Sequence, residues 1–418
     1  MSNEIPEKFN KCLLYLLIFL MVLTGSLNTI LMKCIQKLES LGEAFEGHHW
    51  FSTQLMFLAE LLPLFYYIYF THKRKKQNLI SSKLKNNDEI QEEEAKKKPP
   101  IPTNLIFAIT AGCDLLGNVA SILGLTYLSS SLFQMMKGFL LFFICLFSKI
   151  LLNNPIYRHH ILGVCSLIIG LILVGISSII NSDKDSNIVK HPLIGAFLII
   201  VSQFFTSGVY VFEEKFIKLY DIIPSQIVGF EGLWGLSIFT ILLIIFQFIP
   251  CDDWDIKDDL CTRNDDKKYY MENSIFALKQ MWNNKTILIL YFFYVISVCL
   301  YNIVGVNLTK LVSSAARAVV DNGRTVSVWL FFLIFNPVPG TKENFRVVQF
   351  IGLLFIVFGT LVYNEIIVLP FCGLDYDIRQ KIVERDKENL IKKLEEEEDE
   401  EKLYISIKGK DNSIINNI

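Results

Sequence analysis

The sequence predicts an all-α integral membrane protein with ten transmembrane helices, arranged as two inverted five-helix repeats. Of its 418 residues, 52% are hydrophobic, and the mean hydropathy is +0.40. A helix needs about 20 mostly apolar residues to cross a bilayer, and backbone groups in lipid must be paired within the segment. The ten stretches that meet this requirement are 12–32, 51–71, 103–127, 131–153, 160–181, 192–212, 226–249, 286–307, 312–335 and 346–368.

Basic residues in the connecting segments predict the orientation of these helices. The segment 72–102 carries nine lysines and arginines, which favour the cytosolic side of a membrane. This places the N-terminus, 1–11, and the charged tail, 369–418, in the cytosol, and the loop 250–285 in the lumen. The first repeat then covers 12–181 and the second covers 192–368.

Three pairs of similar segments predict the duplication. The stretch "LTYLSSS" from Leu125 resembles "LTKLVSS" from Leu308 at a separation of 183 residues, and "LTGSLNTILMKCI" from Leu23 resembles "FTSGVYVFEEKFI" from Phe205. A unit of five helices enters the membrane the second time in the opposite sense, and inverted repeats suit a central site that opens alternately to two sides. The third pair is a glycine spacing, in which Gly163 and Gly170 match Gly352 and Gly359.

Charged and amide side chains are embedded in the predicted helices. A charge at the bilayer centre costs about 2.5–3.5 kcal/mol, so such residues usually face a bundle interior or a watery cavity. Arg317, Asp321 and Arg324 are spaced i, i+4, i+7 and share one helical face, where Asp321 can pair with either arginine. We expect a polar cavity between the halves, lined by Gln134, Lys137, Asn302, Arg317, Asp321, Arg324 and Asn118.

The chemistry of these side chains leaves the charge of the substrate open. Lys137, Arg317 and Arg324 suit an anionic or carboxylate-bearing solute, whereas buried carboxyl groups suit a coupled proton or a cationic group. An anionic, a zwitterionic and a cationic substrate all remain possible, and so do purely structural roles such as an Asp321–Arg324 ion pair. The proton-coupling candidates are Asp114, Glu60 and Glu231.

The sequence lacks the motifs of several functional classes, and two of its cysteines are placed to form a disulfide. Cys251 and Cys261 both fall in the predicted lumenal loop, where an oxidising compartment permits a disulfide between them. The sequence has no paired CxxC, HExxH, GxSxG or Walker-type loop. We therefore expect neither a metal site nor a cofactor, neither an enzyme nor an ATP-driven pump.

Six short motifs follow one another between residues 12 and 368. They are "LTGSLNT" at 23–29, "CDLLGN" at 113–118, "SSSLFQMMKG" at 129–138, "EEKF" at 213–216, "GFEGLWG" at 229–235 and "RAVVDNGRTVSVW" at 317–329. As a set they resemble the drug/metabolite transporter superfamily, in its EamA-like, nucleotide-sugar-transporter-like group, and within it solute carrier family 35, subfamily F. The resemblance implies ten helices in two inverted halves, cytosolic termini and alternating access. The family usually has arginine where this chain has Lys137, which keeps the charge without the bidentate fork.

These observations predict a secondary-active transporter of a small polar metabolite, either an exchanger or a proton-coupled carrier. A nucleotide-sugar antiporter is one alternative, and a non-transporting scaffold or receptor that signals through its tails is another. The expected partners are the lipid bilayer and an unidentified small molecule, without nucleic acid, and the protein is expected to be a monomer or a dimer.

Two short segments of the charged tail predict the subcellular location of the protein. "DKENLI" from Asp386 resembles an acidic dileucine sorting signal, and "YISI" from Tyr404 resembles a tyrosine-based one. Sorting adaptors in the cytosol bind such signals. We therefore expect an endomembrane location, which is lysosomal, endosomal or vacuolar. The residues on which this depends are Leu390, Ile391 and Tyr404.

Overall fold

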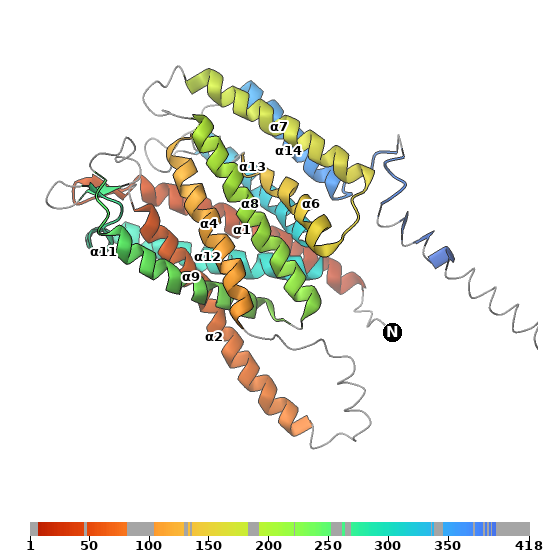
Figure 1. Cartoon of the computed structure of the whole chain (residues 1–418), viewed down its shortest axis with the longest axis horizontal. Coiled ribbons are helices and arrows are strands. Elements are labelled where there is room, and N and C mark those ends of the chain that lie inside the picture. The colour runs from red at the N-terminus through yellow and green to blue at the C-terminus, as the bar shows by residue number, and fades with distance from the viewer. Residues whose placement is uncertain are drawn as a thin grey trace, which may run out of the picture.

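The part of the chain described by the computed structural model consists mainly of helices (Figure 1). Six of them are long and apolar enough to cross a membrane, so the predicted all-α membrane fold is confirmed. These six are α1 (Glu7–Gln36), α2 (His49–Ser81), α4 (Phe107–Thr126), α8 (Pro192–Leu219), α9 (Pro224–Phe246) and α12 (Lys285–Leu311). The structure describes residues 7–45, 48–81, 104–128, 133, 136–182, 192–220, 222–251, 261–263, 269–335, 337, 346–370, 373–378, 381–382, 384–385 and 387–389.

Four further helices lie where the remaining spans were expected, but they are not among the six that are long and apolar enough to cross a membrane. They are α6 (Phe139–Leu152), α7 (Arg158–Ser182), α13 (Ser314–Ile334) and α14 (Val347–Tyr363). The 14 residues of α6 extend about 21 Å, less than the bilayer core of about 30 Å. The charges on α13 lower its hydropathy. The number of ten crossings therefore stays a prediction.

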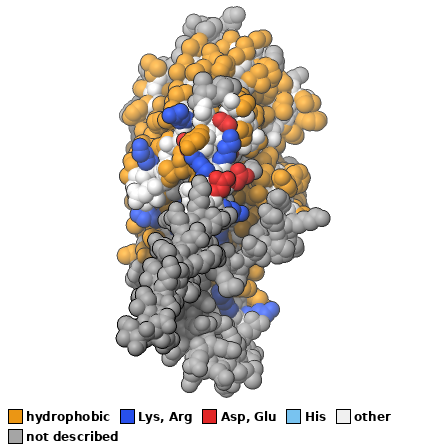
Figure 2. All heavy atoms as spheres, turned by 90° about the vertical axis from the view of Figure 1, so that its right-hand side faces the viewer, with side chains coloured by type: hydrophobic (Ala, Val, Ile, Leu, Met, Phe, Trp, Pro, Cys, Tyr) orange, Lys and Arg blue, Asp and Glu red, His pale blue; other side chains and the backbone are white. Residues whose placement is uncertain are grey.

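Apolar side chains cover much of the surface, and charged ones gather at the end of the molecule where α1 begins. Large hydrophobic residues such as Phe65 on α2, Phe197 on α8 and Phe292 on α12 are exposed. Figure 2 views the end at which α1 starts and shows Lys, Arg, Asp and Glu side chains near the middle of that face, bordered by hydrophobic ones. Extensive exposed apolar surface marks a protein that contacts lipid or another apolar phase.

The predicted glycine spacing brings α7 and α14 into backbone contact along one side of the molecule (Figure 1). A Cβ atom on Gly163 would lie 2.7 Å from the carbonyl oxygen of Gly359, and one on Gly170 would lie 2.6 Å from that of Gly352. Because small residues let membrane helices approach closely, these four positions require glycine.

A similar close approach joins α2 to α9. A Cβ atom on Gly232 would lie 2.4 Å from the backbone carbon of Glu60. The two helices therefore touch at the turn that carries Glu60, and Glu231 directly precedes Gly232 in α9. The motif "GFEGLWG" thus has a packing role that also positions two carboxyl groups.

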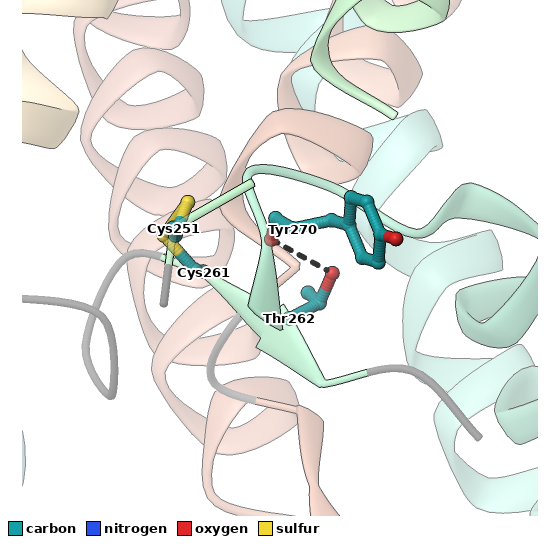
Figure 3. The surroundings of a disulfide bond; sticks show 4 residues. All are labelled: Cys251, Cys261, Thr262 and Tyr270. Atoms are coloured by element: carbon teal, nitrogen blue, oxygen red, sulfur yellow. Dashed lines mark hydrogen bonds between the residues drawn. A yellow bond between two sulfur atoms is a disulfide. The ribbon is translucent and has the colours of Figure 1, made fainter. Parts of the chain in front are cut away.

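The predicted lumenal loop carries a small disulfide-linked structure. Cys251 and Cys261 are joined by a disulfide and are buried (Figure 3). Strand β3 (Thr262–Arg263) pairs antiparallel with β4 (Tyr269–Tyr270), and Thr262 Oγ1 donates to the carbonyl oxygen of Tyr270 at 3.5 Å.

The other short elements are β1 (Glu39–Ser40), β2 (Glu43–Ala44), the 3₁₀ turn η2 (Asn104–Ile106) and α11 (Ser274–Asn283).

A buried carboxylate ties this loop to the start of α2. Glu272 is fully buried; its Oε1 lies 2.7 Å from His48 Nδ1, and its Oε2 accepts the Phe51 N–H at 2.9 Å. A carboxylate at a helix N-terminus satisfies free N–H groups and interacts favourably with the helix dipole. The loop is therefore fixed to the end of the helix bundle at which α2 begins.

Two glycine substitutions test the packing of α2 on α9. Gly232→Ala forces backbone atoms apart, and we expect it to destabilise the protein by about 1–3 kcal/mol. Gly112→Ala on α4 is the matched control, because a Cβ atom there meets nothing within 4 Å. The measurement is the thermal unfolding midpoint in detergent. Equal midpoints for the two variants would contradict the described contact.

Candidate functional site

A cavity of about 350 Å³ lies among α1, α2, α4, α6, α8, α9, α12 and α13. It collects polar side chains that are far apart in the sequence. Gln134 lies outside the described residues, as do Leu390, Ile391 and Tyr404. The predicted residues that line the cavity are Glu60, Asp114, Asn118, Lys137, Glu231, Asn302, Arg317, Asp321 and Arg324.

A buried ion pair between α8 and α13 forms part of the cavity lining. The guanidinium of Arg317 contacts the carboxylate of Glu213, and both residues are 2% exposed. The chain makes room for the arginine at Gly305 of α12, where a Cβ atom would lie 2.6 Å from Arg317 Nε. We call this pair the floor of the cavity.

A chain of hydrogen bonds and ring contacts runs from the floor along the wall. Arg317 lies over the ring of Tyr210, 3.9 Å from its centre, and the hydroxyls of Tyr210 and Tyr301 are 3.3 Å apart. Tyr301 donates to Asp321 Oδ1 at 2.5 Å, and Arg324 donates to Asp321 Oδ2 at 3.2 Å. Of the two pairings open to Asp321, the structure therefore has the one with Arg324, while Arg317 pairs with Glu213.

Three carboxyl groups gather beside the floor, and we call Glu60, Asp114 and Glu231 the acidic cluster. Glu60 and Glu231 are each 8% exposed, and both lie within electrostatic reach of Asp114. Asn302 donates to Glu60 Oε1 at 2.8 Å. Within the described part of the chain, Asp114 Oδ2 and Glu231 Oε1 have no hydrogen-bond partner. The cluster thus presents acceptor oxygens to the cavity.

Two cations lie at another part of the cavity wall, and we call Lys137 and Arg324 the basic pair. Lys137 stands in the turn before α6, is partly exposed, and has its ammonium 4.7 Å from the centre of the Phe133 ring. Arg324 and Asp321 are the charged groups that act on it most strongly. Arg324 reaches the cavity past Gly25 of α1, where a Cβ atom would lie 2.7 Å from the arginine Cδ.

Sequence reasoning missed Glu213, Tyr210 and Tyr301 as parts of this site. Glu213 stands beside Glu214 and Lys215 near the end of its helix, a pattern typical of a solvated helix end. A signal was nevertheless present, because Tyr210 and Glu213 are spaced i, i+3 and so share a helix face.

Three side chains of ligating type lie together outside the cavity. The ligand atoms of His159, His160 and Glu365 are within 4.8 Å of one another, and His159 Nε2 is 3.2 Å from Glu365 Oε1. His160 Nδ1 accepts the Tyr157 N–H at 3.2 Å, which occupies that nitrogen. We interpret the group as a polar contact that joins the start of α7 to the end of α14.

Comparison with known proteins supports the predicted relationship. The family model described as SLC35F, Solute carrier family 35, matches residues 104–258. The resemblance to solute carrier family 35 is confirmed. The Rattus norvegicus protein named solute carrier family 35 member F6 is 28% identical over 353 residues, which are 82% of this chain and 87% of the rat chain.

A human solute carrier family 35 protein, a yeast protein and a solved structure extend this similarity. The Homo sapiens protein named solute carrier family 35 member F6 is 29% identical over 64% of this chain and 68% of its own. An uncharacterised Schizosaccharomyces pombe protein is 25% identical over 85% of this chain and 98% of its own. A protein crystal structure superposes with a TM-score of 0.50 at 11% identity, over 84% of this chain and 96% of that one, which shows a shared fold alone. Together with the six apolar helices, the similarity to solute carrier family 35 indicates a multi-pass membrane protein.

The floor is tested by breaking and reversing its ion pair. Removing one partner of a buried pair typically costs about 3–5 kcal/mol, so Glu213→Gln and Arg317→Gln are each expected to lower the thermal unfolding midpoint sharply. The reversed double variant, Glu213→Arg with Arg317→Glu, is expected to recover part of the loss, as contacting residues couple.

Lys218→Gln is the control for this series. Lys218 is 52% exposed and pairs with Glu214 one turn along the same helix, so its loss is expected to change the midpoint little. Single floor variants that melt like this control would show that the pair does not hold α8 to α13.

Proposed function

We propose that the protein is a secondary-active transporter of a small polar metabolite that works by alternating access. The observation that carries the proposal is a charged cavity enclosed by helices of both predicted halves, with the floor in its lining. Ionisable side chains inside a membrane usually mark a substrate or ion pathway. The similarity to proteins named as solute carriers adds support for this class.

The pairing of helices supports the proposal of two inverted repeats with ten crossings. In this proposal α1, α2, α4, α6 and α7 correspond to α8, α9, α12, α13 and α14. Helix α1 packs on α12, and α4 packs on α8; exchanging the halves converts one contact into the other. The contacts of α2 with α9 and of α7 with α14 are unchanged by the exchange.

The glycine contacts between α7 and α14 follow the same exchange. Gly163 meets Gly359, and Gly170 meets Gly352. When Gly163 is matched to Gly352 and Gly170 to Gly359, each contact becomes the other. Such reciprocal contacts are typical of a two-fold axis, here one that would relate the halves of a single chain.

The shape of the cavity suggests which side is open. Its lining reaches Gln36 and His49, the last residue of α1 and the first of α2. At the opposite end the floor closes it, and there Glu214 Oε2 also accepts the Ser314 N–H at 2.7 Å. With a cytosolic N-terminus, the open side is lumenal and the floor is the cytosolic gate. Opening that gate requires the Glu213–Arg317 pair to separate.

The proposed location is the membrane of a lysosome, endosome or vacuole, with both termini cytosolic. Its support is the basic segment 72–102 and the two sorting-type segments of the tail. Adaptors that read the tail would be the protein partners.

Exchange by the purified protein tests the proposed transport. Liposomes containing the protein are loaded with a defined isotope-labelled mixture of amino acids, carboxylic acids and nucleotide sugars, and efflux is followed by mass spectrometry against an unlabelled mixture outside. Arg324→Ala and Asp114→Asn are expected to lower the exchange of the transported solute roughly tenfold or more, because each removes a charged contact. Elution and unfolding midpoints are checked to establish that both variants fold.

The outcomes separate the competing functions. Exchange that both folded variants retain unchanged would contradict the cavity as the pathway. Exchange confined to nucleotide sugars would favour a nucleotide-sugar antiporter. Absence of exchange for every solute, in protein that folds normally, would contradict transport and favour a scaffold or receptor.

A further inference from the structure

We propose that the cavity selects a small zwitterionic solute, whose amine binds the acidic cluster and whose carboxylate or phosphate binds the basic pair. This inference rests on the proposed function, since it names the substrate class of the same cavity. It is carried by two groups of opposite charge that line one cavity and are each incompletely compensated.

Among the described residues, the acidic cluster has no cation that is not already paired elsewhere. The guanidinium that acts on Glu60 and Asp114 is that of Arg317, which is already paired with Glu213. Each carboxylate of the cluster has a polar neighbour, because Asn302 donates to Glu60, and the side chains of Asn118 and Thr110 hydrogen-bond Asp114 and Glu231. Buried charges require a partner of opposite charge or a full set of hydrogen bonds. The unpartnered oxygens of Asp114 and Glu231 therefore suit a primary ammonium, which has three donors and no acceptor.

The basic pair has the opposite excess. Lys137 and Arg324 bring two positive charges, while Asp321 is the carboxylate that contacts Arg324. One terminal nitrogen of Arg324 bonds Asp321, and its Nε is buried without a hydrogen-bond partner among the described residues. An anionic group of the solute would compensate the remaining charge, and charge-assisted hydrogen bonds of this kind are the strong ones.

The acidic cluster and the basic pair, which we call the two poles of the cavity, lie along one wall. Tyr210 and Tyr301 stand between them, with Tyr210 under Arg317 near the acidic cluster and Tyr301 bonded to Asp321 near the basic pair. A solute with amine and acid groups at its ends fits this order. A cavity of about 350 Å³ is also at the lower end of the roughly 300–1,000 Å³ of small-molecule sites, which favours an amino-acid-sized molecule over a nucleotide sugar.

Solutes that carry charges of one sign only are disfavoured, because one of their charges would lie at the pole of the same sign. A dicarboxylate would place a negative charge near three carboxyl groups, and a diamine would place a positive charge near Lys137 and Arg324. Unpaired charges set against the wrong ligand are a common basis of specificity.

The test measures binding to the purified full-length protein in detergent. The probes are a panel of amino acids and short dipeptides, each with its N-acetyl form, which loses the cation, and its methyl ester, which loses the anionic charge. Phosphoethanolamine is added with its N-acetyl form. At least one zwitterion is expected to raise the unfolding midpoint in a saturable manner. Its N-acetyl and ester forms are expected to bind roughly tenfold more weakly or worse, since each loses a charge-assisted contact.

Variants assign each charge to its pole. Asp114→Asn is expected to raise the Kd of the zwitterion while changing the Kd of its N-acetyl form little, and Lys137→Gln is expected to spare the ester in the same way. Lys137→Arg keeps the charge and is expected to retain binding, and Lys218→Gln, which lies outside the cavity lining, is the control. Lys137→Gln could lose binding and also have a lowered unfolding midpoint. Lys137→Arg then separates loss of the charge from loss of the fold, because it preserves the charge.

Two results would overturn the inference: no zwitterion of the panel binds, or an N-acetyl or ester form binds as tightly as its parent. Its failure is distinguishable from failure of the proposed function. A zwitterion that binds but is not exchanged by liposomes would contradict transport and keep the two-pole site. Exchange of anions alone would keep transport and remove the two-pole site.

Discussion

The organisation of this protein depends on the buried ion pair between Glu213 and Arg317. Two charges that are each 2% exposed carry a large desolvation penalty, which close contact and further polar partners must offset. Arg317 gains such a partner in Tyr210. The pair joins α8 to α13 and, in the proposed carrier, closes one end of the cavity. It also occupies the arginine nearest the acidic cluster, which leaves those carboxyl groups to face the cavity.

Hydropathy predicts the positions of the helices because the bilayer imposes a length and an apolar composition on each. It is less informative for α6, whose 14 residues are short for a membrane core, and for α13, whose apolar character is interrupted by Arg317, Asp321 and Arg324. The shared face of these three charges was predictable from the helical period. The partner of Arg317 was not, because Glu213 lies 104 residues away and resembles a charge at a solvated helix end.

The same contrast applies to the glycines. Their spacing in the sequence suggested duplication, but the contact of Gly163 with Gly359 requires α7 and α14 to cross, which spacing alone does not specify. The contacts of α1 with α12 and of α4 with α8 are likewise visible only in three dimensions. In the proposed carrier these features are connected: small residues allow the halves to pack, and the charges that remain between them line the cavity.

Side-specific labelling of one cavity residue tests the central claim, a hydrated cavity closed by the Glu213–Arg317 pair. Ser121 lines the cavity on α4 and is partly exposed. Ser121→Cys, in a background whose free cysteines are replaced, is treated in sealed vesicles of known orientation with a membrane-impermeant maleimide. Labelling is predicted only from the side that carries the Cys251–Cys261 loop, and Glu213→Gln is predicted to add labelling from the opposite side. No labelling from either side, or equal labelling from both with the pair intact, would contradict the account.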